Sequence, residues 1–244
     1  MYNRIISLVP SQTELLCRLG LSNFIVGVTK FCVHPKHIKK TANIVGGTKH
    51  IHIERIKALK PNIILCNKEE NTKAIVQACK SICTVHVSEI YTLQDSLRLI
   101  AYYGNLFGVN EKSEALISKI TDEKFAFDSF MANKPSLSTL YFIWRLPWMV
   151  AGKQTYIDAL LQLNKFENAS IALRYPEVTL ATDVHVDLVL LSSEPYPFND
   201  KHKNEIQLYY PNAKILLVDG EMFSWHGSRL AKAFRYFKQL RETL

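Results

Sequence analysis

Residues 109–133 read VNEKSEALISKITDEKFAFDSFMAN, and this stretch contains neither Gly nor Pro. Its apolar residues recur at spacings of four and seven, at Leu116, Ile120, Phe127 and Met131. This period predicts a helix with one apolar face, which Asn110 caps at its N-terminus and Pro135 stops just beyond Asn133. About 25 residues at ~1.5 Å each give a helix of roughly 37 Å, close to the diameter of a small domain. We therefore expect this helix to join two lobes.

The segments before and after the helix follow one plan, in which strands alternate with helices. Residues 62–66 (NIILC) and 187–191 (DLVLL) are short apolar runs, each followed by an acidic loop and a helix. Continuous apolar runs are typical of parallel strands that are covered on both faces. We expect an α/β fold with two lobes of parallel sheet flanked by helices and joined by one long backbone helix. The predicted N-terminal lobe, linking helix and C-terminal lobe are 1–108, 109–134 and 135–244.

The order of the elements also indicates an internal duplication. Besides the pair 62–66 and 187–191, the strand predicted at 82–87 corresponds to the one at 215–218. The opening strand of each lobe, at 5–9 and 137–143, is likewise followed by a turn and a helix. No identity between individual residues supports this correspondence, which rests on order and pattern.

The first helix has a local signature at its start. Ser11, Gln12, Thr13 and Glu14 match the pattern of a capping box, in which the Ser and Glu side chains each accept a hydrogen bond from a backbone N–H. We expect this helix to bury Leu15, Leu16 and Leu19 and to end at Gly20.

The composition is that of a globular protein. Hydrophobic residues make up 48% of the 244 residues and charged residues 21%, which is enough apolar material for a core. No run approaches the roughly 18 apolar residues of a membrane-spanning helix, and the N-terminus resembles a first strand rather than an export signal. As written, the sequence predicts a cytoplasmic protein, or one whose signal segment is absent from this sequence. We expect a monomer. The net charge is +8, but Lys and Arg are scattered, so we expect no nucleic-acid binding.

The cysteines give little evidence of metal binding or of disulfide bonds. All five lie within the first 83 residues, at Cys17, Cys32, Cys66, Cys79 and Cys83. The odd count and the lack of a CxxC pair favour buried, reduced thiols, as in a reducing compartment.

The candidate ligand site follows from the predicted strands. In open α/β sheets, ligands bind at the carboxyl ends of the strands, and the loops there hold all three tryptophans of this sequence. Aromatic side chains with a few polar groups suit a bulky, flat, partly apolar ligand, although core packing is a comparable alternative for each tryptophan alone. The candidate ligand-binding residues are Phe31, His34, Trp144, Trp148, Tyr196, Trp225 and His226.

Metal binding is a separate hypothesis. A zinc or manganese site needs three or four converging ligands, and the sequence does not force His34, His86, His185 and Asp219 to converge. We therefore predict no dedicated metal site. Axial ligation of a metal within a bound cofactor by His34 or His226 is left open.

The sequence contains no signature of an enzyme. It lacks the G-x-S-x-G elbow, the P-loop and the H-E-x-x-H motif, so we expect a binding protein with no catalytic residue. Glu69 and Glu70 are adjacent loop residues that point apart, which argues against an acid/base pair. Glu194 occupies the matching loop of the second lobe. One acidic residue at each lobe tip suits docking on basic residues of a partner.

Three stretches resemble class III periplasmic binding proteins, the cobalamin- and ferric-siderophore-binding group with a helical backbone. They are RIISLVPSQTELLCRLG (4–20), IERIKALKPNIILCN (53–67) and DGEMFSWHGSRL (219–230). Two further stretches, IWRLPWMVAGKQTYIDALL (143–161) and SSEPYPF (192–198), are most similar to the cobalamin-binding branch. The resemblance covers nearly the whole chain and agrees with the two-lobe interpretation.

The resemblance implies a fold, a ligand and a partner. Family members hold their ligand in a cleft between two lobes, and glutamates on the lobe tips dock on arginines of an ABC permease. Carried over to this sequence, the docking candidates are Glu69 or Glu70 together with Glu194. The implied pocket walls are Phe31, Trp144, Trp148 and Trp225.

The expected function is therefore that of the ligand-binding component of an ABC-type importer for a metal chelate. Cobalamin is the favoured ligand, haem and ferric siderophores are the other candidates, and no intrinsic cofactor is expected. The family works in the periplasm or at the membrane surface. Two alternatives remain: a cytoplasmic carrier, sensor or enzyme of cofactor metabolism on the same fold, and a receptor for a bare transition metal.

Overall fold

The computed structural model describes residues 2–180 and 185–244, which form two compact units. Unit 1 consists of Met1–Ile90, Gln94–Ile120 and Trp225–Ala231. Unit 2 consists of Tyr91–Leu93, Thr121–Ser224 and Lys232–Leu244. The short segment Trp225–Ala231 thus packs with residues that precede it by more than 100 positions. The lobe boundaries predicted at residues 108 and 135 stay a prediction.

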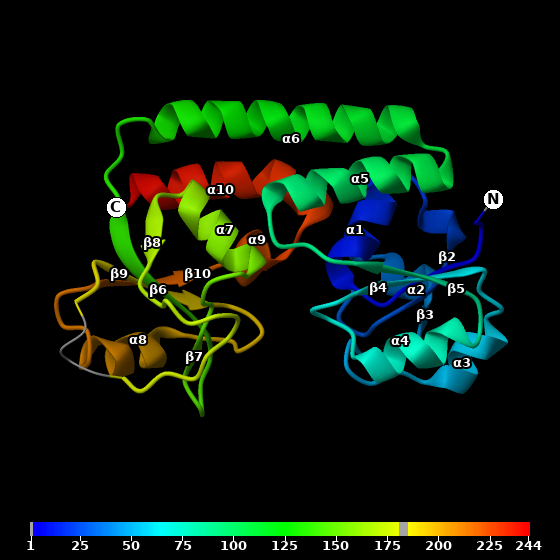
Figure 1. Ribbon diagram of the computed structural model, residues 1–244, viewed down its shortest axis with the longest axis horizontal. Helices are drawn as coiled ribbons and strands as arrows, with labels where there is room; N and C mark the ends of the chain where they lie inside the picture. Colours follow the sequence, from blue (N-terminus) through cyan, green and yellow to red (C-terminus); the bar gives the residue numbers. More distant parts are fainter. Residues whose placement is uncertain (1, 181–184) are drawn as a thin grey trace. The chain divides into compact units, whose positions relative to one another are not determined.

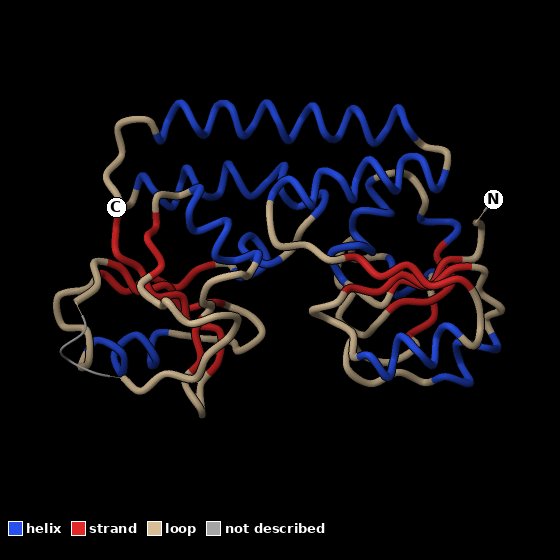
Figure 2. Tube along the Cα trace, viewed as in Figure 1, coloured by secondary structure: helices blue, strands red, loops and turns tan. Residues whose placement is uncertain are grey.

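Unit 1 is built on a sheet of five parallel strands in the order β3-β2-β1-β4-β5 (Figures 1 and 2). The central strand β1 is buried along its whole length, as its continuous apolar sequence predicts. The strands are β1 (Ile5–Ser7), β2 (Ile25–Val28), β3 (Asn43–Ile44), β4 (Ile63–Asn67) and β5 (Thr84–Ser88).

Helices cover both faces of this sheet. In Figure 1, α3 and α4 lie on one face, and α1 and α5 lie on the other. Ile56 of α3 and Ile75 of α4 pack with the sheet residues Ile6 and Ile64 in one apolar core. The helical segments are α1 (Pro10–Arg18), η1 (Ser22–Phe24), α2 (Ile38–Thr41), α3 (Ile53–Ala58), α4 (Lys73–Lys80), α5 (Leu93–Phe107) and η2 (Gly227–Arg229).

Unit 2 contains a second sheet, in which β10, β9, β6 and β8 are parallel neighbours and β7 pairs antiparallel with β6. Figure 1 shows α8 on one face of this sheet and α7 and α10 on the other. The strands are β6 (Leu137–Trp144), β7 (Met149–Val150), β8 (Phe166–Asn168), β9 (Leu188–Ser192) and β10 (Lys214–Val218). The helices are α7 (Tyr156–Leu163), α8 (Asp200–Gln207), α9 (Gly220–Ser224) and α10 (Leu230–Glu242).

The two sheets share one strand order. The sequence β2-β1-β4-β5 in unit 1 has the same connectivity as β8-β6-β9-β10 in unit 2. The apolar runs at 62–66 and 187–191 become β4 and β9, which hold equivalent places. The predicted correspondence in order is therefore confirmed. The short elements α2, α9, β3, β7 and β8 were not predicted, because two to five residues carry too little periodicity.

The long helix is α6 (Asn110–Met131), which contributes its first part to unit 1 and the rest to unit 2. Its four predicted apolar positions are at most 5% exposed, which confirms the apolar face: Leu116, Ile120, Phe127 and Met131. The helix ends two residues before the predicted Asn133. In the described part of the chain, neither α6 nor any other helix has the length and hydropathy of a membrane span.

Candidate functional site

Unit 1 places two of the predicted ligand residues in contact at one end of its sheet. The rings of His34 and Trp225 meet edge to face with centroids 5.4 Å apart. The guanidinium carbon of Arg229 lies 4.9 Å from the centre of the Trp225 ring. Arg229 Nε donates to Glu14 Oε2 at 2.9 Å, and both side chains of this ion pair are largely buried. The Trp225 ring therefore packs against an arginine that is itself held in place.

The neighbouring His226 is buried against α1. Its Nε2 lies 3.2 Å from Ser11 Oγ, and the next backbone N–H, at Gly227, donates to Ser96 Oγ at 2.7 Å. Burial lowers the pKa of His226 to about 4, so the ring is neutral near pH 7. His226 is only 6% exposed, and its contact with Ser11 connects the segment after Trp225 to α1 of unit 1.

The capping box predicted for α1 is wrong. Pro10 is the first residue of α1, and among the described residues no side chain caps this helix at Val9. Ser11 and Glu14 lie within the helix, where they bind His226 and Arg229. The burial of Leu15, Leu16 and Leu19 and the left-handed Gly20 (φ +82°) are as predicted.

Phe31, which follows β2 in unit 1, is more exposed than Trp225. Its ring is 49% exposed, and Lys30 Nζ lies 5.0 Å above the ring centre. A Cβ atom added at Gly47 would come within 3.1 Å of Phe31 Cε2, so the ring rests on a backbone that has no side chain. Phe31 therefore presents an aromatic face to solvent beside one positive charge.

Unit 2 brings together the other aromatic residues predicted for the site. Trp144 meets Tyr196 at 5.7 Å, and Tyr196 meets Phe198 at 4.8 Å. Trp148 stacks on Phe198 at 6.0 Å with 7° between the ring planes. Trp144 is 40% exposed, whereas Phe198 is buried. We call these four residues the unit 2 aromatic cluster; it combines a buried base with an accessible tryptophan.

Two polar pairs hold the unit 2 aromatic cluster in place. Arg145 lies over the Trp148 ring at 5.6 Å and donates two hydrogen bonds, of 3.0 and 3.1 Å, to Glu205. His202 Nε2 lies 3.2 Å from the Tyr196 hydroxyl. The other ring nitrogen of His202 accepts from Asn199 N at 3.0 Å in a capping box of α8. The sequence analysis missed His202, although it stands three positions after the N-cap Asn199, at N3 of the capping box.

The three glutamates predicted to dock on a partner are all half-buried. Glu69 and Glu70 follow β4, and Glu194 follows β9. Burial raises the pKa of Glu70, with Lys49 acting in the opposite direction and Glu69 in the same direction. Glu194 Oε1 accepts from Ser224 Oγ at 2.7 Å. The docking role of these residues stays a prediction.

The described residues contain no group of three or more His, Cys, Asp or Glu side chains that could hold a metal ion. His86 stacks on Tyr102 at 4.7 Å, and His185 is exposed in unit 2. All five cysteines lie in the described part of the chain and are free thiols. Burial raises the pKa of Cys32.

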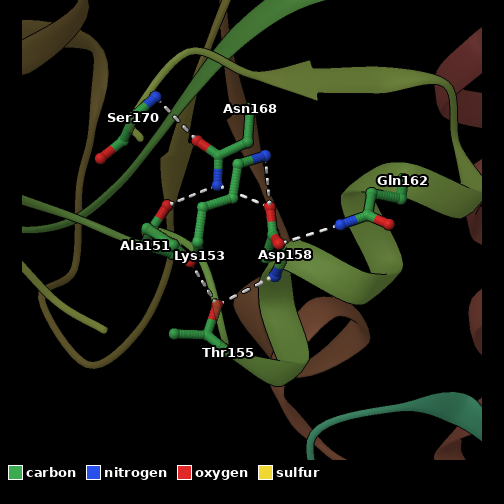
Figure 3. Close-up of polar contacts among 8 residues, drawn as sticks. Ala151, Lys153, Thr155, Asp158, Gln162, Asn168 and Ser170 are labelled. Atoms are coloured by element: carbon green, nitrogen blue, oxygen red, sulfur yellow. Dashed lines mark hydrogen bonds and ion pairs between the residues drawn. The ribbon is translucent and has the colours of Figure 1, made fainter. Parts of the chain in front are cut away.

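Sequence analysis also missed a buried polar network at the start of α7 (Figure 3). Thr155 caps this helix by accepting from Asp158 N at 3.0 Å. The Asp158 carboxylate accepts from Gln162 Nε2 at 2.9 Å and from Asn168 Nδ2 at 2.9 Å, and Lys153 Nζ lies 3.4 Å away. Asp158 is only 5% exposed, so these partners take the place of water around its carboxylate. The Thr155-x-x-Asp158 spacing is a capping signal that the sequence carries.

Asn168 extends the network from α7 to the chain after β8. Its side-chain amide donates to Ala151 O at 2.9 Å as well as to Asp158. Its carbonyl oxygen accepts from Ser170 N at 3.1 Å (Figure 3). One side chain thus connects the segment between β7 and α7, the helix itself and the loop that follows β8.

Comparison with known proteins identifies the family. A family model described as periplasmic binding protein matches residues 5–175. The chain belongs to the periplasmic binding protein family. The ABC transporter substrate-binding lipoprotein YvrC of Bacillus subtilis is 26% identical over 176 residues, which cover 68% of this chain and 55% of the relative. A vitamin B12-binding protein of Yersinia pestis is 44% identical over 62 residues, covering 25% of this chain and 22% of the relative.

Solved structures of this family share the fold. A periplasmic haem-binding protein of Pseudomonas aeruginosa superimposes with a TM-score of 0.83 at 18% identity, covering 98% of this chain and 92% of that chain. The vitamin B12-binding protein BtuF of Vibrio cholerae gives 0.76 at 17% identity, covering 100% and 99%. The predicted α/β fold and the resemblance to class III periplasmic binding proteins are confirmed. The curated relatives are matched over about half of their length or less.

Proposed function

We propose that this chain is the ligand-binding component of an ABC-type importer for a metal chelate. Cobalamin is the favoured ligand, and haem and ferric siderophores are the next candidates. The observation that carries this proposal is the unit 2 aromatic cluster, whose exposed Trp144 is the last residue of β6, in a member of the periplasmic binding protein family. Exposed aromatic rings on a rigid base suit the flat, partly apolar surface of such a ligand.

The sequence comparison favours cobalamin over haem, whereas the comparison of folds does not distinguish the two ligands. The match of 44% identity is to a protein named for vitamin B12, whereas the structural neighbours at 17–18% identity include both haem and vitamin B12 binders. The ligand residues proposed for unit 1 are Phe31, His34, Trp225 and His226. Those proposed for unit 2 are Trp144, Trp148 and Tyr196. The placement of the ligand between two lobes stays a prediction.

The proposed partner is the membrane permease of the importer, and the proposed place of action is the periplasm or the membrane surface. Glu69 or Glu70 in unit 1 and Glu194 in unit 2 supply the acidic docking residues. Each lies in a loop directly after a strand, where a half-buried carboxylate can still reach a basic side chain.

Thermal unfolding with added ligands tests this proposal. The purified protein is heated alone and with cyanocobalamin, haem, a ferric siderophore, Zn²⁺ or Mn²⁺. A ligand at hundredfold excess over its Kd adds about 2.7 kcal/mol to the free energy of unfolding, a shift of several degrees. Stabilisation by one chelate supports the proposal. Stabilisation by a bare metal alone, or chemical change of a bound chelate, favours the metal receptor or the enzyme instead.

A further inference from the structure

The loop at residues 170–174, which follows β8 in unit 2, exposes two large aliphatic side chains. Ile171 is 88% exposed and Leu173 is 57% exposed. Single apolar residues on a surface are common and need no explanation. Two of them at alternate positions of one loop form a small apolar tip. A binding role for this tip requires that the loop be held in one conformation.

Backbone hydrogen bonds hold the loop against the segment that leads into α7. Lys153 N donates to Ala172 O, and Arg174 N donates to Lys153 O, both at 2.8 Å. Gly152 N donates to Arg174 O at 2.8 Å. A Cβ atom at Gly152 would lie 2.2 Å from Ala172 O, so only glycine permits this close approach.

Side chains hold both ends of the loop. At its start, Asn168 binds Ser170 and connects the loop to the buried Asp158 (Figure 3). At its end, the Arg174 guanidinium lies 5.4 Å from the Tyr91 ring and 5.6 Å from the Tyr175 ring. Arg174 Nη1 also donates to Gln154 O at 2.9 Å.

The backbone at this place is strained. Arg174 has φ +66° and Gln154 has φ +59°, and neither is a glycine. Left-handed conformations of such residues cost about 1–3 kcal/mol each and cluster at ligand clamps and active sites. A fold that holds strained residues to present an apolar tip to water is typical of a binding surface.

We propose that the 170–174 loop contacts the apolar face of the bound metal chelate through Ile171 and Leu173. This inference rests on the proposed function and adds a contact surface that the sequence analysis did not identify. Asn168 is a positioning residue, because it acts on the ligand only through the loop. The chain directly after the loop pairs with the segment that carries Trp148: Val150 N donates to Pro176 O at 3.2 Å, and Val178 N donates to Trp148 O at 2.9 Å.

The size of the tip favours a small ligand over a protein partner. A stable protein interface takes about 20–30 residues and roughly 800 Å² from each partner. Two aliphatic side chains supply a small fraction of that area, whereas they match the apolar contact that one face of a small, flat ligand requires.

Polar substitution of the tip tests the proposal. The variants Ile171→Ser and Leu173→Ser should fold like the wild type, because both side chains are exposed. Leu208→Ser is the matched control, since Leu208, the C-cap residue of α8 in the same unit, is 75% exposed. Affinities for haem and, in parallel, for cyanocobalamin are measured by titration of tryptophan fluorescence. Each loop variant should weaken binding of the transported chelate at least about tenfold, and the control should change it less than about twofold.

The outcomes separate this inference from the proposed function. Wild-type protein that binds a chelate, together with loop variants of unchanged affinity, overturns the role of the loop and leaves the proposed function standing. Wild-type protein that binds neither probe overturns both. A loss of affinity equal to that of Leu208→Ser also overturns the loop proposal, because it would reflect a general effect of exposed polar substitutions.

A double-mutant cycle tests Asn168. Asn168→Ala should weaken binding in the wild-type background about as much as Ile171→Ser, and should weaken it little further in the Ile171→Ser, Leu173→Ser background. A purely structural role would lower affinity equally in both backgrounds, and that result would overturn the positioning role. Melting temperatures of all variants show that the affinities are measured on folded protein.

Discussion

The two units use a tryptophan at the end of a sheet in different ways. In unit 1, Trp225 is 7% exposed and lies between His34 and an arginine that is paired with Glu14. In unit 2, Trp144 is 40% exposed, and Tyr196 meets it on one side. The same residue type is therefore part of a buried assembly in one unit and of an accessible surface in the other. We expect substitution of Trp225 to change stability first, and substitution of Trp144 to change ligand affinity first.

The largest effect expected is that of Trp225→Ala. The substitution removes a buried ring and leaves a cavity beside the Arg229 guanidinium, which costs about 3–5 kcal/mol for a large aromatic residue. Urea unfolding of the variant at pH 7, followed by circular dichroism, measures this loss. Trp144→Ala serves as the matched control and should lose no more than about 1 kcal/mol.

Equal losses of stability in the two variants would contradict the proposed difference between the two tryptophans. The tryptophans would then both be packing residues, and exposure would not distinguish their roles. A small loss for Trp225→Ala would show that the assembly around Arg229 collapses into the cavity without cost.

The second effect is a pH dependence that belongs to unit 1. Burial lowers the pKa of His226 to about 4, below the value of about 6.5 for an unfolded histidine. The unfolded chain therefore binds the proton at higher pH than the folded chain. The stabilisation is complete above pH ~6.5 and is lost as the pH falls toward 4, by about 3 kcal/mol in total.

Comparison of wild type with His226→Gln isolates this contribution, because other groups titrate in both proteins. Free energies of unfolding are measured in urea at pH 7, 6, 5 and 4. The difference between wild type and variant should shrink by about 3 kcal/mol across this range. A difference that is constant with pH would show that folding leaves the pKa of His226 at its unfolded value, contrary to its burial beside Ser11.

The sequence predicted the elements that have a local apolar pattern. It failed where contacts with a distant segment determine which partners a side chain binds. The apolar period of α6 and the continuous runs of β4 and β9 are local, and they predicted the architecture. Ser11 and Glu14 have the spacing of a capping box, yet they bind His226 and Arg229, more than 200 positions later in the chain. A local pattern cannot show that a remote segment offers stronger partners, because burial makes the ion pair and the histidine contact more favourable than a solvent-exposed cap.

The candidate site was predictable in part for a related reason. The rule that ligands bind at strand ends identified Trp144, Trp148 and Tyr196, and the structure gathers these three in one cluster. The 170–174 loop could not be found in this way, because its exposed residues follow the short strand β8, which has no clear apolar pattern. Its support by Asp158 depends on contacts among a helix, a strand and a loop, of which the sequence carries only the Thr155-x-x-Asp158 spacing.

The smallest expected effect tests the difference between the two tryptophans most directly, because it concerns binding alone. Trp144→Ala removes an accessible ring that has little packing to lose, so the melting temperature should change little. The ring is proposed to be covered by the ligand, and loss of that contact should weaken binding by about 1.5–3 kcal/mol, or roughly ten- to hundredfold. Titration of the variant with cyanocobalamin and with haem measures this loss, with Leu208→Ser again as control. Wild-type affinity in Trp144→Ala would remove this residue from the site, and the role of the unit 2 aromatic cluster would then rest on Tyr196 and Trp148.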